Sequence, residues 1–285
     1  MIEILSWNIQ VGLGVDGRHD LARIAREIAA MGDPDVICLQ EVCRFMSSLD
    51  GSGADQVAEL SRHFPDHEPV FGPAFESRRE AGESYRQLGN LILSRLPVLS
   101  VLRHPLPRPA AAGIKHMPRQ ALEICVSAGP RPLRVITTHL EYHSPAQRRA
   151  QIERLCALQR EALDNLAAPP MVLNEGPYAP IPRPADCVVC GDFNMVVADT
   201  EYRLMLSESS AGAPLYCDAW PAVKGDESHH ATCGIYDSAQ WPEGPHCRDF
   251  FFVAPQLKGR LKGFVVNAET DASDHQPLAI RLDIS

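Results

Sequence analysis

The sequence lacks any apolar run that approaches the length of a membrane-spanning helix, and no charged-then-apolar signal segment precedes residues 1–5. It also lacks an excess of positive charge, since 27 Lys and Arg stand against 36 Asp and Glu for a net charge of −9. Proteins that hold long nucleic acid by bulk electrostatics need a basic face. We therefore expect no stable membrane insertion. Nucleic acid stays possible as a partner, through a local basic patch, but is not favoured.

A framework of paired cysteines is missing as well. The nine cysteines are an odd number and most lie within apolar runs, which fits a reduced, cytoplasmic protein better than a disulfide scaffold. Cys187 and Cys190 form a CxxC pattern, but this pattern falls inside a predicted strand and on opposite faces of it. We expect these two thiols to pack in the core.

The rest of the composition is that of a globular chain, with 45% hydrophobic and 22% charged residues. A length of 285 residues allows one large α/β domain or two small ones, and we expect a single domain over residues 1–285. Helices are predicted to begin near residues 20, 55, 144 and 200. Because helices and strands do not alternate strictly, we expect two packed sheets flanked by helices. Strands are predicted at residues 2–9, 36–39, 88–93, 98–102, 121–126, 133–138, 187–190, 249–253 and 278–282, with irregular structure at 72–86 and in the proline-rich segment 168–185.

Residues 187–194, Cys-Val-Val-Cys-Gly-Asp-Phe-Asn, place two polar side chains where a buried strand ends. Side chains alternate between the faces of a strand, so Asp192 and Asn194 project the same way while Phe193 anchors in the core. An Asx turn, which Asp and Asn favour, explains this stretch equally well when it is taken alone.

Other predicted strands also end in polar groups, and this repetition favours a shared site. A helix, a turn, an apolar strand and a polar exit occur twice, at residues 20–41 and 144–194, which suggests two similar halves. Each polar residue also has a plain structural explanation, such as a turn residue, a solvated carboxylate or a histidine in the core. The residues at these strand exits are Asn8, Glu41, His139, Asp274 and His275, and Asp249 opens a further strand.

Hydrolysis of a phosphate ester sets requirements that these residue types meet. A hard divalent cation such as Mg²⁺ needs oxygen ligands, which Glu41 and Asn8 would supply. The phosphoryl oxygens need fixed donors in the transition state, for which His139 and Asn194 are candidates. The attacking water must be deprotonated and the leaving oxygen protonated. Candidates for that work are Asp192 and a His275–Asp249 pair, in which the carboxylate fixes the tautomer of the histidine.

Seven short motifs follow one another along the chain: Trp7-Asn8, Leu39-Gln40-Glu41-Val42, residues 89–94, Thr138-His139-Leu140, residues 191–194, residues 249–252 and residues 273–275. In this order they resemble the motifs of the endonuclease/exonuclease/phosphatase superfamily, which includes pancreatic-type DNase, abasic-site repair endonucleases, bacterial sphingomyelinases and inositol-polyphosphate phosphatases. The resemblance covers nearly the whole chain. Gly-Asp-Phe-Asn and Ser-Asp-His at this distance are hard to produce by chance.

The resemblance implies a DNase-like α/β fold, a four-layer αββα sandwich of two packed mixed β-sheets with the site at one edge. It implies Glu41 as the principal Mg²⁺ or Mn²⁺ ligand, with Asn8 beside it and Asp274 near the metal or the water. It also implies that His139 and Asn194 contact the phosphate and that Asp192 acts on the water or the leaving group. Asp249 would pair with His275.

The expected function is metal-dependent hydrolysis of a phosphate ester, more a diester than a monoester, on a small-molecule or lipid-headgroup substrate. A DNA-directed nuclease, a phosphomonoesterase and a non-catalytic binding module stay open as alternatives. The tyrosine that repair nucleases place before the Gly89-Asn90 motif has no clear equivalent, because Tyr85 is offset. Five further residues could either contact the substrate or be structural. Arg119 and Arg148 could bind a phosphate, and His116, His229 and His230 could lie at the rim of the pocket.

Overall fold

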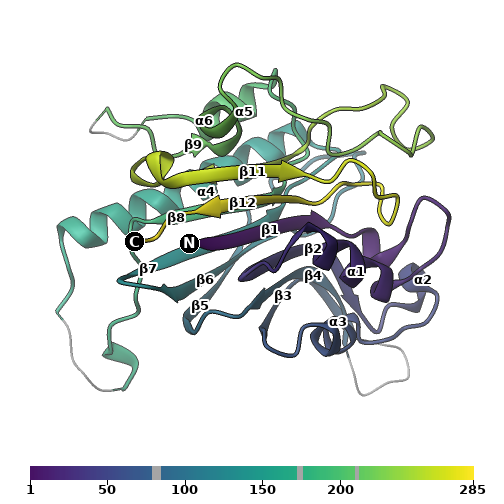
Figure 1. The fold of residues 1–285 in the computed structure, drawn as a ribbon, viewed down its shortest axis with the longest axis horizontal. Helices are drawn as coiled ribbons and strands as arrows, with labels where there is room; N and C mark the ends of the chain where they lie inside the picture. Colours follow the sequence, from purple (N-terminus) through teal and green to yellow (C-terminus); the bar gives the residue numbers. More distant parts are fainter. Residues whose placement is uncertain (79–84, 172–175, 209–211) are drawn as a thin grey trace.

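Two six-stranded mixed sheets form the centre of the computed structural model, which describes residues 1–78, 85–171, 176–208 and 212–285 (Figure 1). The first sheet has the order β11-β12-β1-β2-β4-β3 and the second has the order β5-β6-β7-β8-β10-β9. The first contains β1 (Ile2–Asn8), β2 (Val36–Arg44), β3 (Glu68–Arg78), β4 (Tyr85–Ser94), β11 (Leu261–Val266) and β12 (Leu278–Leu282). The second contains β5 (Val98–Pro105), β6 (Gln120–Ala128), β7 (Arg131–His139), β8 (Cys187–Asp192), β9 (Cys217–Asp218) and β10 (Asp249–Val253).

Helices pack on these sheets, and the expected DNase-like α/β sandwich is confirmed. Three helices begin where the sequence predicts, because the side chains of Asp20, Asp55 and Ser144 accept hydrogen bonds from backbone N–H groups of the first turn. The helices are α1 (Leu21–Met31), α2 (Ser47–Asp50), α3 (Gln56–His63), α4 (Pro145–Ala167), α5 (Thr200–Met205) and α6 (Ala219–Lys224), with short 3₁₀ turns at Gln10–Gly12, Gly176–Tyr178 and Pro255–Arg260.

Each sheet contains a parallel pair of strands, β1 with β2 and β7 with β8. The connection between the strands of each pair contains a helix, α1 in the first sheet and α4 in the second. At the carboxyl ends of these pairs Asn8 lies opposite Gln40, and His139 lies opposite Asp192. The side chain of Gln40 crosses to the other sheet and donates to Thr137 Oγ1 at 2.8 Å. The repeated pattern in the sequence therefore corresponds to two strand pairs that end side by side.

The sheets enclose an apolar core that also takes up most of the thiols. All nine cysteines are free, and Cys187 and Cys190 are fully buried in the main core cluster, as expected. One buried ion pair interrupts this apolar interior: Arg134, with no exposed surface, donates to Glu123 Oε1 at 2.9 Å. Burial alone would raise the pKa of Glu123, but His104 and Arg134 outweigh it and lower that pKa to about 2. Glu123 is therefore ionised at neutral pH.

Several predicted boundaries were wrong. Residues 72–86 were expected to be a polar loop, but β3 and β4 pair as an antiparallel ladder up to Arg78 and Tyr85, with a register shift between Pro73 and Phe75. This end of the β3–β4 pair is partly exposed, so polar side chains can stay in contact with water while the backbone pairs as a strand. Strand pairing therefore outweighs the polar composition there. Residues 79–84, and residues 172–175 of the proline-rich segment, lie outside the described part of the chain. The sequence also failed to predict β9, β11 and the short helices α2 and α6.

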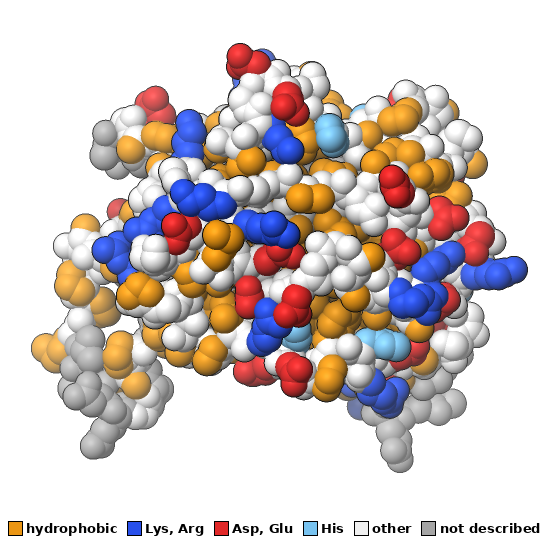
Figure 2. Space-filling view, in the orientation of Figure 1, with side chains coloured by type: hydrophobic (Ala, Val, Ile, Leu, Met, Phe, Trp, Pro, Cys, Tyr) orange, Lys and Arg blue, Asp and Glu red, His pale blue; other side chains and the backbone are white. Residues whose placement is uncertain are grey.

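The surface mixes charges of both signs. Figure 2 shows Lys and Arg side chains interspersed with Asp and Glu on the face that carries β11, β12 and β1. Within the described residues, none of the helices combines the length and the hydropathy that crossing a bilayer requires.

Candidate active site

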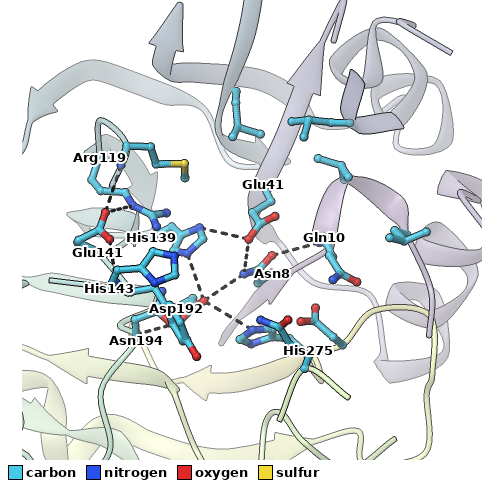
Figure 3. A pocket seen from close by; sticks show the side chains of 18 of the residues that line it. Asn8, Gln10, Glu41, Arg119, His139, Glu141, His143, Asp192, Asn194 and His275 are labelled. Atoms are coloured by element: carbon cyan, nitrogen blue, oxygen red, sulfur yellow. Dashed lines mark hydrogen bonds and ion pairs between the residues drawn. The ribbon is translucent and has the colours of Figure 1, made fainter. Parts of the chain in front are cut away.

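A pocket of about 660 Å³ opens at the edge where β1, β2, β7 and β8 end (Figure 3). Seven of the eight predicted site residues line this pocket, and the eighth, Asp249, is buried behind His275. The structure therefore brings together side chains that are up to 267 positions apart, from Asn8 to His275. The seven are Asn8, Glu41, His139, Asp192, Asn194, Asp274 and His275.

The carboxylate of Asp192 lies at the centre of the site. Its Oδ2 accepts a hydrogen bond from Asn8 Nδ2 at 3.1 Å, and it lies 3.4 Å from His139 Nε2 and 3.7 Å from His275 Nε2. Its Oδ1 accepts from the backbone N–H of Asn194 at 2.8 Å. Burial raises the pKa of this carboxyl, and the positive charge on His275 opposes that rise. A buried carboxylate with a raised pKa is a stronger proton acceptor than an exposed one.

Backbone strain holds two of these side chains in place. Glu41 and Asn194 both adopt a left-handed conformation, with φ of 58° and 49°, which residues other than glycine rarely adopt. Glu41 does so at an irregularity in the pairing of β2 with β4, which turns its side chain into the pocket. Gly191 precedes the second turn, and a Cβ there would lie 1.9 Å from the carbonyl oxygen of Thr138. Only glycine therefore allows β8 to approach β7 this closely.

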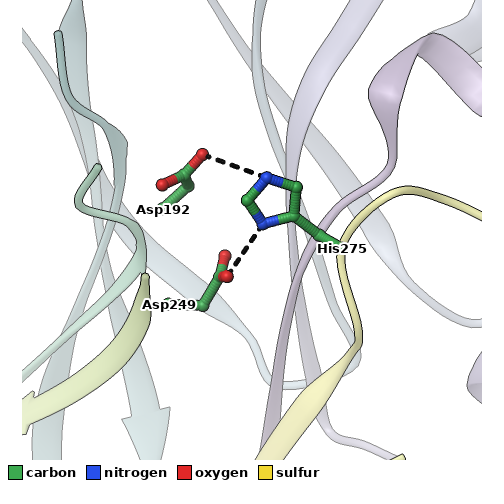
Figure 4. Close-up of side chains that lie close together, drawn as sticks. All are labelled: Asp192, Asp249 and His275. Carbon is green, nitrogen blue, oxygen red and sulfur yellow. Dashed lines mark hydrogen bonds and ion pairs between the residues drawn. The ribbon is translucent and has the colours of Figure 1, made fainter. Parts of the chain in front are cut away.

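His275 and Asp249 form the expected pair (Figure 4). His275 Nδ1 lies 2.8 Å from Asp249 Oδ2, which also accepts from Thr232 Oγ1 at 2.6 Å. Burial alone would lower the pKa of His275, but the carboxylates of Asp249, Asp192 and Asp274 outweigh it and raise that pKa well above its usual value. His275 is therefore an imidazolium at neutral pH, with Nε2 directed toward Asp192.

Contacts from the first sheet fix the turn that carries His275. Trp7 Nε1 donates to the carbonyl oxygen of His275 at 2.8 Å, and Ser273 Oγ donates to the carbonyl oxygen of Asn8 at 2.8 Å. Both contacts are buried. The end of β1 thus positions the turn of residues 273–275 directly.

His139 has the opposite charge state. Burial, and then the positive charges of Arg119 and His275, lower its pKa well below the usual value. The neutral ring lies between two carboxylates, with Nδ1 3.7 Å from Glu41 Oε1 and Nε2 3.4 Å from Asp192 Oδ2. A neutral imidazole in this position can donate one hydrogen bond and accept another.

The donor set fits a divalent cation on the side of Glu41. Burial raises the pKa of the Glu41 carboxyl, and repulsion from the Asp274 carboxylate raises it further. A cation between these two carboxylates would remove that repulsion, and carboxylate oxygens are the ligands that Mg²⁺ prefers. Asn8 fits less directly, because its Oδ1 accepts from the N–H of Gln10 while its Nδ2 donates to Glu41 at 3.2 Å. A ligand role for Asn8 requires its amide to turn over.

A second group that could hold a metal is formed by Asp192, Asp249 and His275, whose donor atoms lie within 4.8 Å of one another. Here His275 already supplies a positive charge to both carboxylates. A nitrogen donor suits Mg²⁺ less well than oxygen does. The chemistry of the donors therefore favours the Glu41 side of the pocket for a hard cation.

Sequence reasoning missed a buried ion pair beside His139. Glu141 is fully buried and accepts from Arg119 Nε at 3.4 Å and from the N–H of His143 at 2.9 Å. Arg119 is itself 7% exposed and lines the pocket, and its Nη1 has no hydrogen-bond partner among the described residues. The position of Glu141, two residues after His139, was the available signal. Arg148 is structural, since its guanidinium donates to the carbonyl oxygens of Glu141 and Tyr142.

The remaining walls of the pocket differ in character. Exposed His116 and His143 line it, whereas His229 lies outside this lining and pairs with Asp218 at 2.7 Å in a small cavity that Asp249 also lines. Val11, Leu13, Leu49 and Leu88 form an apolar side. Two aromatic residues, Tyr142 and Trp241, form another side, with their ring centroids 5.9 Å apart.

Comparison with solved structures finds proteins of the same fold. A structure of an endonuclease/exonuclease/phosphatase from Beutenbergia cavernae has a TM-score of 0.70 and 22% identity, over 99% of this chain and 71% of that chain. A mannosyl-6-phosphatase from Bacteroides thetaiotaomicron has a TM-score of 0.67 and 16% identity over 100% of both chains. A 3′ phosphatase from Neisseria, bound to a product DNA hairpin, has a TM-score of 0.61 and 19% identity, over 99% of this chain and 100% of that chain. A search of curated proteins finds no match.

At these identities the structural likeness shows the fold alone, whereas the family model is matched by the sequence itself. The model of the Endonuclease/Exonuclease/phosphatase family matches residues 5–275, nearly the whole chain. The motifs at the strand ends and the pocket that they line lie within this match. The chain belongs to the Endonuclease/Exonuclease/phosphatase family.

Proposed function

We propose that this protein is a Mg²⁺- or Mn²⁺-dependent phosphoester hydrolase that favours phosphodiesters of small-molecule or lipid-headgroup type. The observation that carries the proposal is the position of Asp192. This buried carboxylate is flanked in one pocket by the Asn8 amide, the neutral His139 and the protonated His275. A proton acceptor, a neutral donor and a proton donor are the groups that in-line attack of water on a phosphate ester requires.

The residues divide the work by charge state. Asp192, with a raised pKa, accepts the proton of the attacking water. His139 is neutral and donates to a phosphoryl oxygen, and Arg119 adds positive charge beside it. His275 is held in one orientation by Asp249, and its imidazolium donates the proton that the leaving oxygen takes up.

Glu41 and Asp274 are the residues that would hold the cation, with Asn8 joining them if its amide turns over. A bound Mg²⁺ or Mn²⁺ supplies Lewis acidity and neutralises phosphoryl charge. Asn194 supports Asp192 through its backbone N–H, while its side chain donates to the carbonyl oxygen of Leu140 at 3.0 Å. One N–H of the Asn194 amide is thus used by Leu140, and the other N–H can make the expected contact with the phosphate.

The shape and lining of the pocket support a small substrate. Its apolar side next to the catalytic groups fits the alcohol part of a lipid or another organic ester. The net charge of −9 disfavours long nucleic acid. A phosphomonoesterase is the second candidate, because a mannosyl-6-phosphatase shares the fold over the full length of both chains. The free thiols fit a reducing compartment such as the cytoplasm.

A comparison of chromogenic esters tests the substrate class. With Mn²⁺ or Mg²⁺ present, we expect bis(p-nitrophenyl) phosphate to be hydrolysed with a higher kcat/KM than p-nitrophenyl phosphate, and duplex DNA to be cut more slowly than either. Release of nitrophenolate and a gel assay for DNA provide the two measurements. A monoester preference would replace the diester proposal by the phosphatase alternative, and DNA cleavage that outpaces both esters would establish the nuclease alternative.

A further inference from the structure

A compact loop, residues 234–245, lies against the catalytic groups and is closed at its base by backbone pairing. The N–H groups of Cys233 and His246 each donate to the other's carbonyl oxygen at 3.1 Å, and Cys233 also pairs with His275. The interior of the loop is tightly packed, since a Cβ on Gly234 would lie 2.4 Å from the carbonyl oxygen of Gly244. We call this segment the Trp241 loop.

Gln240 and Trp241 are the residues of this loop that line the pocket, and Trp241 is the one whose ring contacts His275. It is 2% exposed, it lines the pocket, and its ring meets the ring of His275 edge to face with centroids 5.7 Å apart. It also meets the ring of Tyr142 edge to face on the aromatic side of the pocket. Rings in such contact restrict each other's orientation. Trp241 therefore packs directly against an imidazolium whose direction matters for the chemistry.

Arg248 holds Trp241 from behind. Its guanidinium carbon lies 4.8 Å from the centroid of Trp241 and 5.5 Å from the centroid of Tyr142, so it contacts both aromatic rings. Its Nε donates to His246 Nε2 at 2.6 Å, at the base of the loop. His246 must then carry its proton on Nδ1, which lies 2.7 Å from the carbonyl oxygen of Gly244.

The same residue also contacts the catalytic turn of β8. Arg248 Nη1 donates to the carbonyl oxygen of Asn194 at 3.4 Å, and its own carbonyl oxygen accepts from the N–H of Phe193 at 3.0 Å. Its N–H donates to Thr232 Oγ1, which in turn donates to Asp249. One arginine thus joins the Trp241 loop, the turn of Asp192 and Asn194, and the support of Asp249.

Arg248 does not act as an ordinary surface arginine. Its ion pair with Glu243 spans 3.4 Å to a side chain that is 48% exposed, and such pairs contribute little. The arginine side chain itself is 16% exposed and stays behind Trp241 and Tyr142, outside the lining of the pocket. Its planar fork reaches the acceptors of His246 and Asn194 and two aromatic rings at once, which a lysine cannot do.

We propose that Arg248 is a positioning residue that acts through Trp241: it fixes the Trp241 loop against His275 and the Asn194 turn. This inference rests on the proposed phosphoester hydrolysis, because it assigns how the acid–base groups of that reaction are oriented. Without the guanidinium, Trp241 and the ring of His275 gain freedom to move, and misplacement of catalytic groups lowers kcat more than it changes KM.

A double-mutant cycle with Arg248→Met and Trp241→Ala tests this role on the ester that the wild type hydrolyses best. We expect each single variant to lower kcat at least about tenfold while KM changes less than about threefold. Because Arg248 acts through Trp241, we expect the double variant to match the lower single variant within about threefold. Trp241→Phe keeps a ring in place and retains kcat within about threefold. Glu243→Gln removes only the exposed ion pair and serves as the matched control, with unchanged kcat.

Four results separate the possible failures. Arg248→Met with kcat within about threefold of the wild type contradicts the proposal, as does a double variant whose loss is the product of the two single losses. If Arg248→Met does not fold at the assay temperature, Arg248→Lys takes its place with the same expected loss of kcat, and retention of activity there overturns the role of the planar fork. If the wild type hydrolyses no phosphate ester, the proposed function itself is contradicted. This inference, which rests on that reaction, is then overturned with it.

Discussion

Replacement of His275 by alanine is expected to lower kcat by at least about a hundredfold, since a positioned acid or base contributes about 10²- to 10⁴-fold. The loss follows from two contacts. Nε2 of this imidazolium lies 3.7 Å from Asp192, and Nδ1 is fixed by Asp249 at 2.8 Å. Without the ring, Asp192 loses its positive neighbour, and no proton donor remains in that position. Steady-state kinetics on the preferred ester measure the effect.

The control for this variant is a half-buried His–Asp pair in the same chain. His229 lies 2.7 Å from Asp218, and neither residue lines the pocket of the candidate site, although both line a smaller cavity that Asp249 also lines. We expect His229→Ala to keep kcat within about threefold, provided that turnover is normalised to the folded fraction. Asp249→Asn should reduce kcat as well, because it removes the charge that holds His275 protonated. Near-normal turnover of His275→Ala would show that the His275–Asp249 pair has no part in the reaction.

Replacement of Glu41 by glutamine is expected to raise the Mg²⁺ or Mn²⁺ concentration needed for half-maximal activity by at least about tenfold, because a charged ligand oxygen is lost. Glutamine has the same shape as glutamate, and its side-chain oxygen can still accept the hydrogen bond from Asn8 Nδ2. It also removes the repulsion between Glu41 and Asp274, so the folded protein should not be less stable. Titration of activity with metal and a thermal unfolding curve measure both effects.

Glu153→Gln is the matched control for this second variant, since Glu153 lies on the exposed side of α4 and is 52% exposed. It should leave the metal titration unchanged. If Glu41→Gln needs no more metal than the wild type, the cation is bound elsewhere. The group of Asp192, Asp249 and His275 would then be the remaining candidate among the described residues.

The grouping of the candidate site residues could be predicted because of a general property of strands. Asn8, Glu41, His139 and Asp192 each follow or end an apolar run, and parallel strands end at the same edge of a sheet. Sequence therefore indicated which side chains meet. It could not indicate how they meet: the left-handed backbone of Glu41 and the orientation of the Asn8 amide depend on pairing with β4 and on contact with Gln10.

Other features depend on contacts between distant segments and left no local signal. Trp241 and Arg248 lie seven positions apart in a segment without regular periodicity, and the closed base between Cys233 and His246 brings Trp241 against His275 with Arg248 packed on its ring. In the same way β3 has a polar composition that predicts a loop, and only its ladder with β4 makes it a strand. Tertiary pairing outweighs local propensity in both cases.

The most direct test of the central claim is hydrolysis of a chromogenic phosphodiester by the chelator-treated protein, before and after addition of Mg²⁺ or Mn²⁺, with Asp192→Asn as the blank. We expect no turnover without metal, turnover that returns when metal is added, and a loss of at least about a hundredfold in Asp192→Asn under the same conditions. Turnover that persists in chelator, or that survives in Asp192→Asn, would contradict a metal-dependent hydrolase built around this carboxylate.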